Sequence, residues 1–386
     1  MDFSLTEDQR AFADAATQFA NDKLAPNAAK WDENQIFPKD VLKEAGEMGF
    51  LSLYVPEPQG GLGLPRLDAS IIFEQLAMGC TSTTAYMTIH NMVAWMIANF
   101  AKDEVKEQFC PLLVSGESLG SYCLTEANAG SDAASLTTTA IKQGDEYIIS
   151  GAKAFISGAG DTDVLVVMAR TDQHLKGASG ISAFVVPAEA NGISYGRKEP
   201  KMGWNSQPTR AVTFDDVRVP SSYLLGNEGD GFKFAMKGLD GGRINIATCS
   251  LGTAQQALEM ARQYVDERKQ FGQKLADFQS VQFKLADMTT ELVAARQLVR
   301  YAAFQLDQQT PEATAYCAMA KRFATDVGFK VCDQALQLYG GYGYIKEYPL
   351  ERYFRDVRVH QILEGTNEIM RLIIARRILS EGSRLL

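Results

Sequence analysis

The chain is poor in histidine, and its cysteines are not paired. It has 3 histidines and 6 cysteines in 386 residues, with no Cys-x-x-Cys pair and no histidine at ligand spacing. A structural zinc site needs clustered thiolates or imidazoles, and a disulfide framework needs closely spaced cysteines. The sequence therefore predicts no metal site and no disulfide framework, and it offers few imidazoles for a serine or cysteine triad.

Long apolar runs and long basic runs are also missing. No stretch reaches the roughly 18 uncharged apolar residues that a membrane-spanning helix requires. The formal net charge of −9 works against loose binding to DNA or RNA. We therefore expect no membrane span and no nucleic-acid partner, and any anionic ligand must be held by a few cations and backbone amides.

What the chain does contain is typical of a folded, water-soluble protein. Hydrophobic residues make up 46% and charged residues 22%. The length suggests two or three domains. The first residues show neither a basic region followed by an apolar one nor an Arg-rich amphipathic leader. We expect a bacterial cytoplasmic protein or, for a matured eukaryotic form, one of the mitochondrial matrix.

The apolar periodicity changes twice along the chain. Residues 1–117 show helical spacing and a plausible helix cap at Thr6. Residues 118–222 hold short Val-, Ile- and Phe-rich segments between Gly, Asp and Asn, which predict an antiparallel, barrel-like β domain. Residues 223–386 return to long helical patterns. The sequence predicts a mainly α fold with an N-terminal helical domain, a central β domain and a C-terminal four-helix bundle.

One carboxylate stands among apolar neighbours directly before a predicted helix. Glu364 lies between Leu363 and Gly365 in the segment 361–368. Such a carboxylate can be desolvated, which raises its proton affinity toward the range useful for a general base at neutral pH. A solvated start of a helix is the simpler alternative for this segment alone.

Two segments of the β region resemble ligand loops. Residues 122–132 leave a predicted strand into small polar residues, whose backbone amides could face ligand oxygens. Residues 153–160 add a second such loop with the aromatic side chain of Phe155, on which a planar ring could stack. Ordinary surface turns remain the alternative for both segments.

Glycines mark three further places in the C-terminal helices. Gly241 and Gly242 interrupt a helical stretch between Asp240 and Arg243, which leaves room for a ligand, a kink or close helix packing. The planar guanidinium of Arg268 suits a pyrophosphate, although a helix cap would also explain it. Residues 334–344 end a helix with more glycines than a C-cap needs. No Gly-x-Gly-x-x-Gly follows a strand, so a doubly wound dinucleotide fold is not supported.

These segments, in this order, resemble the acyl-CoA dehydrogenase family across essentially the whole chain. The similarity rests on residues 122–132, 155–157, 268–271, 337–341 and 363–368. Segments 80–86, 203–210, 238–243 and 360–364 favour a member acting on short branched acyl-CoA. Two positions depart from the family pattern: Ala127 stands where proline is common, and Phe155 stands where tryptophan is frequent.

The resemblance implies FAD as cofactor, an acyl-CoA substrate, an electron transfer flavoprotein as acceptor and a homotetramer. It implies FAD contacts at Tyr122, Leu124, Thr125, Gly130, Ser131, Phe155, Ile156, Ser157, Arg268, Phe271, Phe278, Gln279, Gln337, Gly340, Gly341, Thr366, Asn367 and Glu368. It implies substrate contacts at Ser131, Asp240, Gly241, Gly242, Arg243, Gly365 and Arg376. Arg268, Phe271 and 337–341 would serve the FAD of a neighbouring subunit.

The resemblance also implies the chemistry. Glu364 would remove the proton α to a thioester carbonyl while a hydride leaves the β-carbon for flavin N5. Some family members carry the base on the helix of residues 240–243, but the corresponding position here is Gly242, which cannot take a proton. The favoured substrate is isobutyryl-CoA, giving methacrylyl-CoA in valine breakdown. The alternatives are a straight or 2-methyl-branched short-chain dehydrogenase, an acyl-CoA oxidase and a non-catalytic scaffold.

Overall fold

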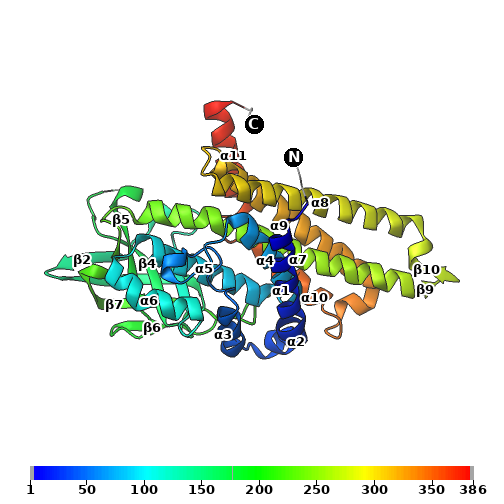
Figure 1. Ribbon diagram of the computed structural model, residues 1–386, viewed down its shortest axis with the longest axis horizontal. Coiled ribbons are helices and arrows are strands. Elements are labelled where there is room, and N and C mark those ends of the chain that lie inside the picture. Colours follow the sequence, from blue (N-terminus) through cyan, green and yellow to red (C-terminus); the bar gives the residue numbers. More distant parts are fainter. Residues whose placement is uncertain (1–3, 176, 383–386) are drawn as a thin grey trace.

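The computed structural model describes residues 4–175 and 177–382. The sheet lies at one end of the long axis of the molecule, and the long C-terminal helices extend to the other end (Figure 1). The order is helical, then β, then helical, as the sequence predicts. The N-terminal helices are α1 (Glu7–Phe19), α2 (Ala25–Asn34), α3 (Lys39–Glu47), α4 (Arg66–Gly79), α5 (Thr81–Phe100) and α6 (Asp103–Ser115), with a short π turn at Ala20–Leu24.

The predicted cap at the first helix is confirmed as a capping box. The backbone N–H of Gln9 donates to Thr6 Oγ1 at 3.1 Å, and the Thr6 N–H donates to Gln9 Oε1 at 3.1 Å. Helix α5 is buried along almost its whole length, which explains its apolar sequence.

The central region is an eight-stranded sheet. Its strands are β1 (Gly120–Cys123), β2 (Thr139–Gln143), β3 (Glu146–Ser157), β4 (Val164–Arg170), β5 (Ile181–Pro187), β6 (Ile193–Tyr195), β7 (Thr209–Pro220) and β8 (Leu224–Leu225). Most neighbours run antiparallel in the order β6-β7-β3-β2-β4-β5-β8, but β2 and β1 both pair with β4 in parallel. The chain enters β1 from a helix rather than from a hairpin, so no tight turn makes β1 antiparallel to its neighbour.

The C-terminal region consists of α7 (Gly231–Glu267), α8 (Gln279–Asp307), α9 (Ala313–Tyr339), α10 (Leu350–Arg358) and α11 (Asn367–Glu381). A small hairpin of β9 (Lys269–Gln270) and β10 (Gln273–Lys274) joins α7 to α8. Helix α7 is central, since α4, α5, α8 and α9 all pack against it. Alanines dominate its buried face against α8 and α9, which lets the helices approach closely.

Helix α7 runs as one helix through residues 240–243. Tertiary packing on several sides outweighs the helix cost of two glycines, which is about 1 kcal/mol each. All six cysteines are free and buried. In the described ranges, no helix is long and apolar enough to cross a membrane, and no cluster of His, Cys, Asp and Glu could hold a metal ion.

Candidate active site

Glu364 lies on a tight segment between a 3-10 turn (Val359–Gln361) and α11. Its φ of 54° is in the left-handed region, and Gly365 follows with a φ of 85°. A left-handed conformation at a non-glycine residue costs on the order of 1 to 2 kcal/mol and is found mainly at functional sites. Thr366 then caps α11, accepting a hydrogen bond from the Ile369 N–H at 3.3 Å. The predicted start of a helix directly after Glu364 is confirmed.

The carboxylate of Glu364 lies against the backbone of α7 at Gly242. A Cβ at Gly242 would lie 2.5 Å from Glu364 Oε2, so only glycine leaves room for the carboxylate. Oε2 is buried and has no hydrogen-bond partner among the described residues. Although the residue as a whole is only partly buried, its carboxylate end is therefore desolvated. Burial raises the pKa of Glu364 to about 7, against the opposing effects of Arg243 and Lys321.

Asp240 and Arg243 form the pair on one helix face that their spacing predicts. Arg243 Nη1 contacts Asp240 Oδ1 at 2.6 Å, and both side chains are largely buried. Thr314 Oγ1 donates to Asp240 Oδ2 at 2.7 Å. Burial raises the pKa of Asp240, while Arg243 opposes the shift. Arg243 Nε is buried and lacks a partner in the described structure, so the guanidinium keeps bonding capacity for a ligand.

The sequence reasoning missed Arg66, at the start of α4. Its guanidinium occupies the space that a side chain at Gly241 would need and lies 3.4 Å over the ring of Tyr54. Arg66 Nη1 is buried without a described partner. The two adjacent glycines of α7 therefore make room for Arg66 and Glu364, two side chains of the protein. The sequence signal was an arginine directly after Pro65 on an apolar helix, a position usually taken as solvated.

Tyr122, at the end of β1, adds another unpartnered buried group. Its hydroxyl has no hydrogen-bond partner in the described residues, and burial followed by the charge of Glu364 raises its pKa. Glu364 also contributes to the raised pKa of Tyr54, after burial. The unpartnered polar atoms of Arg66, Tyr122, Arg243 and Glu364 thus surround one region beside α7. Buried polar atoms are nearly always paired in folded proteins, so this grouping is typical of a ligand site.

The two predicted ligand loops lie side by side. The Ala154 N–H donates to the Thr125 carbonyl at 2.9 Å. Lys153, which is fully buried, donates to the Leu124 carbonyl at 3.1 Å and to Glu126 Oε1 at 2.9 Å. Burial alone would raise the pKa of Glu126, but Lys153 and the hydrogen bonds of the site lower it to about 2. This buried ion pair, which sequence reasoning also missed, ties the first loop to β3.

The exposed surface of these loops fits a planar ring and a phosphate chain. Phe155 is 69% exposed and holds a φ of 58°, so its ring stands clear of the sheet. A Cβ at Gly130 would meet nothing within 4 Å, which leaves that backbone open to a ligand. Ile156 instead packs into the core of the sheet, and Ser157 accepts a hydrogen bond from Ser121 at its carbonyl. An exposed ring at Phe155 and an open backbone at Gly130 are features that a planar cofactor could use.

The expected cofactor residues from 268 to 279 and from 337 to 341 lie toward the far end of the molecule, around the β9–β10 hairpin (Figure 1). A cavity of about 390 Å³ there is lined by Arg268, Gln337, Gly340 and Gly341, among others. Phe271 is 93% exposed at the hairpin tip, and Phe278 and Gln279 follow at the start of α8. One chain does not bring this group together with Phe155, so a single cofactor can contact both only across two subunits.

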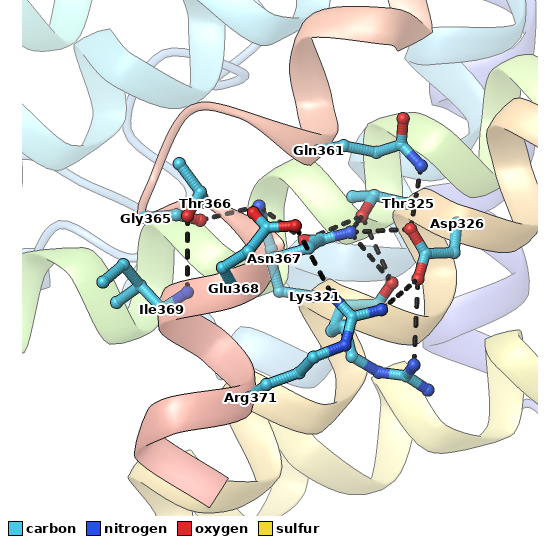
Figure 2. A network of polar contacts seen from close by, with 11 residues as sticks. Lys321, Thr325, Asp326, Gln361, Gly365, Thr366, Asn367, Glu368, Ile369 and Arg371 are labelled. Carbon is cyan, nitrogen blue, oxygen red and sulfur yellow. Dashed lines mark hydrogen bonds and ion pairs between the residues drawn. The ribbon is translucent and has the colours of Figure 1, made fainter. Parts of the chain in front are cut away.

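The residues after Glu364 are held by α9 (Figure 2). Asn367 is buried, and its side-chain amide donates to Asp326 at 2.8 Å and to Thr325 at 3.0 Å. Glu368 is exposed and lies 3.9 Å from Arg371. Arg376 is exposed on α11. The side-chain amide of Asn367 is therefore already hydrogen-bonded within the protein, whereas the side chains of Glu368 and Arg376 are accessible to a ligand.

Three family models match the chain: the N-terminal domain of acyl-CoA dehydrogenase at residues 6–117, the middle domain at 121–217 and the C-terminal domain at 229–379. Mitochondrial isobutyryl-CoA dehydrogenase of Bos taurus is 53% identical, covering 98% of this chain and 90% of that protein. The Dictyostelium discoideum protein of the same name is 56% identical, and the match covers 97% of this chain and 90% of that protein. The structure of butyryl-CoA dehydrogenase from Megasphaera elsdenii superposes with a TM-score of 0.95 at 41% identity, covering 98% of this chain and all of that one.

The similarity extends over nearly the full length of each protein, so it covers the helical regions, the sheet and the segment of Glu364 together. The chain belongs to the acyl-CoA dehydrogenase family and is an FAD-dependent oxidoreductase of that family.

Proposed function

We propose that this protein dehydrogenates a short branched acyl-CoA between its α- and β-carbons, that isobutyryl-CoA is the preferred substrate, and that Glu364 is the base. The observation that carries the proposal is the buried, unpartnered Oε2 of Glu364 seated at Gly242. A carboxyl with a pKa of about 7 is ionised in roughly half of the molecules at neutral pH. It is therefore basic enough to accept a proton and still available to do so.

Glu364 takes the proton α to the thioester carbonyl. Bound FAD supplies the two-electron acceptor for the hydrogen that leaves the β-carbon. Negative charge develops on the thioester oxygen during proton removal and needs a hydrogen-bond donor. The backbone N–H of Glu364 has no acceptor in the described part of the chain, so it donates to this oxygen. One residue thus supplies both the base and a donor.

The FAD is held from its own subunit by the two loops of the β region and the start of α11, with contacts at Tyr122, Leu124, Thr125, Gly130, Ser131, Phe155, Ile156, Ser157, Thr366, Asn367 and Glu368. Ile156 and Asn367 make these contacts through their backbones. A neighbouring subunit adds contacts around its β9–β10 hairpin, at Arg268, Phe271, Phe278, Gln279, Gln337, Gly340 and Gly341. The separation of the two groups within one chain supports this division (Figure 1). We propose a homotetramer on the same ground, with an electron transfer flavoprotein as the acceptor. Either a bacterial cytoplasm or the mitochondrial matrix is compatible with these partners.

The acyl-CoA is contacted by residues of the first loop, α7 and the segment around α11, namely Ser131, Asp240, Gly241, Gly242, Arg243, Gly365 and Arg376. The free Nε of Arg243 supports a polar contact with the thioester arm beside Glu364. Gly241 and Gly242 act by admitting Arg66 and Glu364 to the wall of the site.

The preference for isobutyryl-CoA is supported by the isobutyryl-CoA dehydrogenases of Bos taurus and Dictyostelium discoideum, which are 53% and 56% identical to this chain. A straight short-chain substrate is the second candidate, supported by the likeness to a butyryl-CoA dehydrogenase at 41% identity. The two substrates are isomers that differ only in the position of one methyl group, and one such group in a pocket is worth only about 1 to 3 kcal/mol, so the two candidates differ in rate rather than in all-or-none activity.

Anaerobic bleaching of the flavin by a panel of acyl-CoAs tests the proposal. Isobutyryl-CoA should bleach the holoenzyme fastest, ahead of butyryl-CoA and 2-methylbutyryl-CoA. Faster bleaching by butyryl-CoA would establish the straight-chain alternative. Peroxide formed at the rate of turnover in air would identify an oxidase, and a purified protein without FAD would identify a scaffold.

A further inference from the structure

Lys321 on α9 is fully buried beside the segment that carries Glu364. Its Nζ donates to the Gly365 carbonyl at 2.8 Å and to Asn367 Oδ1 at 2.9 Å (Figure 2). Neither acceptor is a carboxylate. A lysine is almost never buried without a charged partner, because removing an ammonium from water is costly. We therefore expect the Lys321 ammonium to have a role that offsets the free-energy cost of its desolvation.

The two acceptors of Lys321 flank the turn into α11. Gly365 directly follows Glu364, and Asn367 is the first residue of α11. Asn367 in turn bonds Thr325, one helical turn beyond Lys321 on the same face of α9. The chain from Glu364 to Asn367 is thus fastened to α9 by one lysine and one asparagine.

The fastened segment is the strained one. Glu364 holds a left-handed backbone conformation, and Gly365 follows with a positive φ that glycine adopts freely. At a residue with a side chain such as Glu364, this conformation persists only where surrounding contacts impose it. The Lys321 bond to the Gly365 carbonyl fixes the orientation of the peptide plane between residues 365 and 366. Together with the backbone angles of Gly365, that plane restrains the peptide between residues 364 and 365, from which the Glu364 side chain projects.

We propose that Lys321 is a positioning residue for the base, holding the Glu364–Gly365 backbone on α9 so that the carboxylate stays seated at Gly242. The inference rests on the proposed role of Glu364. Lys321 makes no contact with the reacting atoms; it acts through the carbonyl of Gly365 and through its charge. Its charge favours the ionised form of Glu364.

Other charged groups face Lys321 from each element packed against it. Arg243 on α7 lowers its proton affinity, whereas Glu364, Asp326 on α9 and Glu368 on α11 raise it; burial is the largest effect and lowers the pKa of Lys321 to about 8. His360 is buried nearby, and burial followed by the charge of Lys321 lowers its pKa to about 3, so it is neutral. Arg243 and Lys321 are therefore the two cations that stabilise the Glu364 carboxylate.

Two substitutions separate the bond from the charge. Lys321→Gln keeps an N–H for the Gly365 carbonyl but removes the charge, and Lys321→Met removes both. Each is measured by the rate of anaerobic flavin bleaching as a function of pH, with FAD retention and thioester binding as checks of folding. Lys330→Met is the matched control, because Lys330 lies on α9 but pairs with Glu291 on the surface.

Both variants should shift the pH midpoint of bleaching to higher pH, because Glu364 loses a stabilising cation. Lys321→Met should also lower the plateau rate, which is the bleaching rate at pH values above the midpoint, at least about tenfold while it binds the thioester normally. Lys321→Gln should show a smaller loss of this rate. Should Lys321→Met fail to fold, the midpoint and plateau of Lys321→Gln carry the test.

A folded, FAD-containing Lys321 variant with the parent's midpoint and plateau would overturn the positioning role. Failure of the proposed function is distinguishable, because Glu364→Gln would then remain active whatever the Lys321 variants do. An inactive Glu364→Gln beside unaffected Lys321 variants would contradict this inference alone.

Discussion

At the scale of single residues, the site depends on position 242 being a glycine, which has no side chain. The carboxylate of Glu364 fits against α7 only because position 242 is glycine. The left-handed backbone of Glu364 and the bond from Lys321 bring the carboxylate to that position. A methyl group at position 242 would therefore compete directly with the base.

We predict that Gly242→Ala keeps the fold and the FAD but loses most of the activity. The added Cβ would lie 2.5 Å from Glu364 Oε2, so the carboxylate must move. A displacement of about 1 Å at a reacting group can lower the rate about 100-fold. Single-turnover flavin bleaching measures the loss. Gly238→Ala is the control on the same helix, where the new Cβ meets the flexible Met92 side chain at 3.3 Å; comparable losses in both variants would contradict the role given to Gly242.

The sequence predicted the burial of Glu364 from its apolar neighbours, and the structure has that carboxylate buried. It did not predict Arg66, Lys153 or Lys321, since a single cation in an apolar helix or strand resembles a solvated residue that faces outward. Only the assembled fold shows that each points inward at carbonyls, glycines or a carboxylate.

At the scale of elements, the buried Lys153–Glu126 pair connects the loop after β1 to β3. The pair joins the two loops that the sequence analysis predicts as ligand loops. Glu126 also accepts from the backbone N–H groups of Thr137 at 2.7 Å and Thr138 at 2.9 Å. The loop after β1 therefore has its shape fixed from inside the protein.

We predict that Lys153→Met destabilises the protein by about 3 to 5 kcal/mol, because it leaves Glu126 buried without its cation. FAD should dissociate more readily, since the first loop loses its attachment. Lys153→Met combined with Glu126→Gln should recover part of the stability. Urea unfolding followed by fluorescence measures both effects.

Arg218→Met is the matched control, because its pair with Glu146 is about half exposed on both sides. It should cost less than about 1 kcal/mol. Equal costs for Lys153→Met and Arg218→Met would show that the buried pair does not hold the loop.

Elements were predicted well where the periodicity is local and less well where distant segments meet. The two glycines of α7 left the choice between a ligand, a kink and close helix packing open, and packing from α4, α5, α8 and α9 keeps the helix continuous. The pairing of β1 with β4 could not be predicted, because strands about 40 residues apart choose partners through the whole fold.

At the scale of the whole molecule, the sheet with the two predicted ligand loops and the β9–β10 hairpin lie toward opposite ends of the long axis (Figure 1). Phe271 and Tyr344 at the end of the bundle are 93% and 82% exposed. Large exposed aromatic side chains of this kind mark interaction surfaces. Completion of the site by a neighbouring copy of the chain accounts for both observations.

We predict that Arg268→Ala weakens FAD binding at least about tenfold, because a guanidinium on a phosphate contributes more than about 1.4 kcal/mol. Under the proposed sharing of FAD between subunits, Arg268 contacts an FAD whose Glu364 belongs to the neighbouring subunit, so proton removal by Glu364 should be unaffected once FAD is in excess. Fluorescence titration of the apoprotein with FAD measures the affinity. Arg262→Ala on the same helix is the control, since Arg262 pairs with Glu259 on the surface; parent-like FAD affinity in Arg268→Ala would contradict the phosphate role.

The order of helical, β and helical regions was readable from the sequence, because it depends on local periodicity. The domain boundaries at 117 and 222 stay predictions. The separation of Phe155 from Arg268 was not readable, because it depends on the length and direction of α7 (Gly231–Glu267) relative to the sheet.

The most direct measurement is the rate of anaerobic flavin bleaching by isobutyryl-CoA in Glu364→Gln. Glutamine fits the same space at Gly242 but cannot accept the proton. The variant should keep its yellow FAD and bind the thioester, while bleaching falls at least about 100-fold. A variant that retained more than about a tenth of the parent rate, a loss below about 1.4 kcal/mol in the barrier, would contradict the assignment of Glu364 as the base.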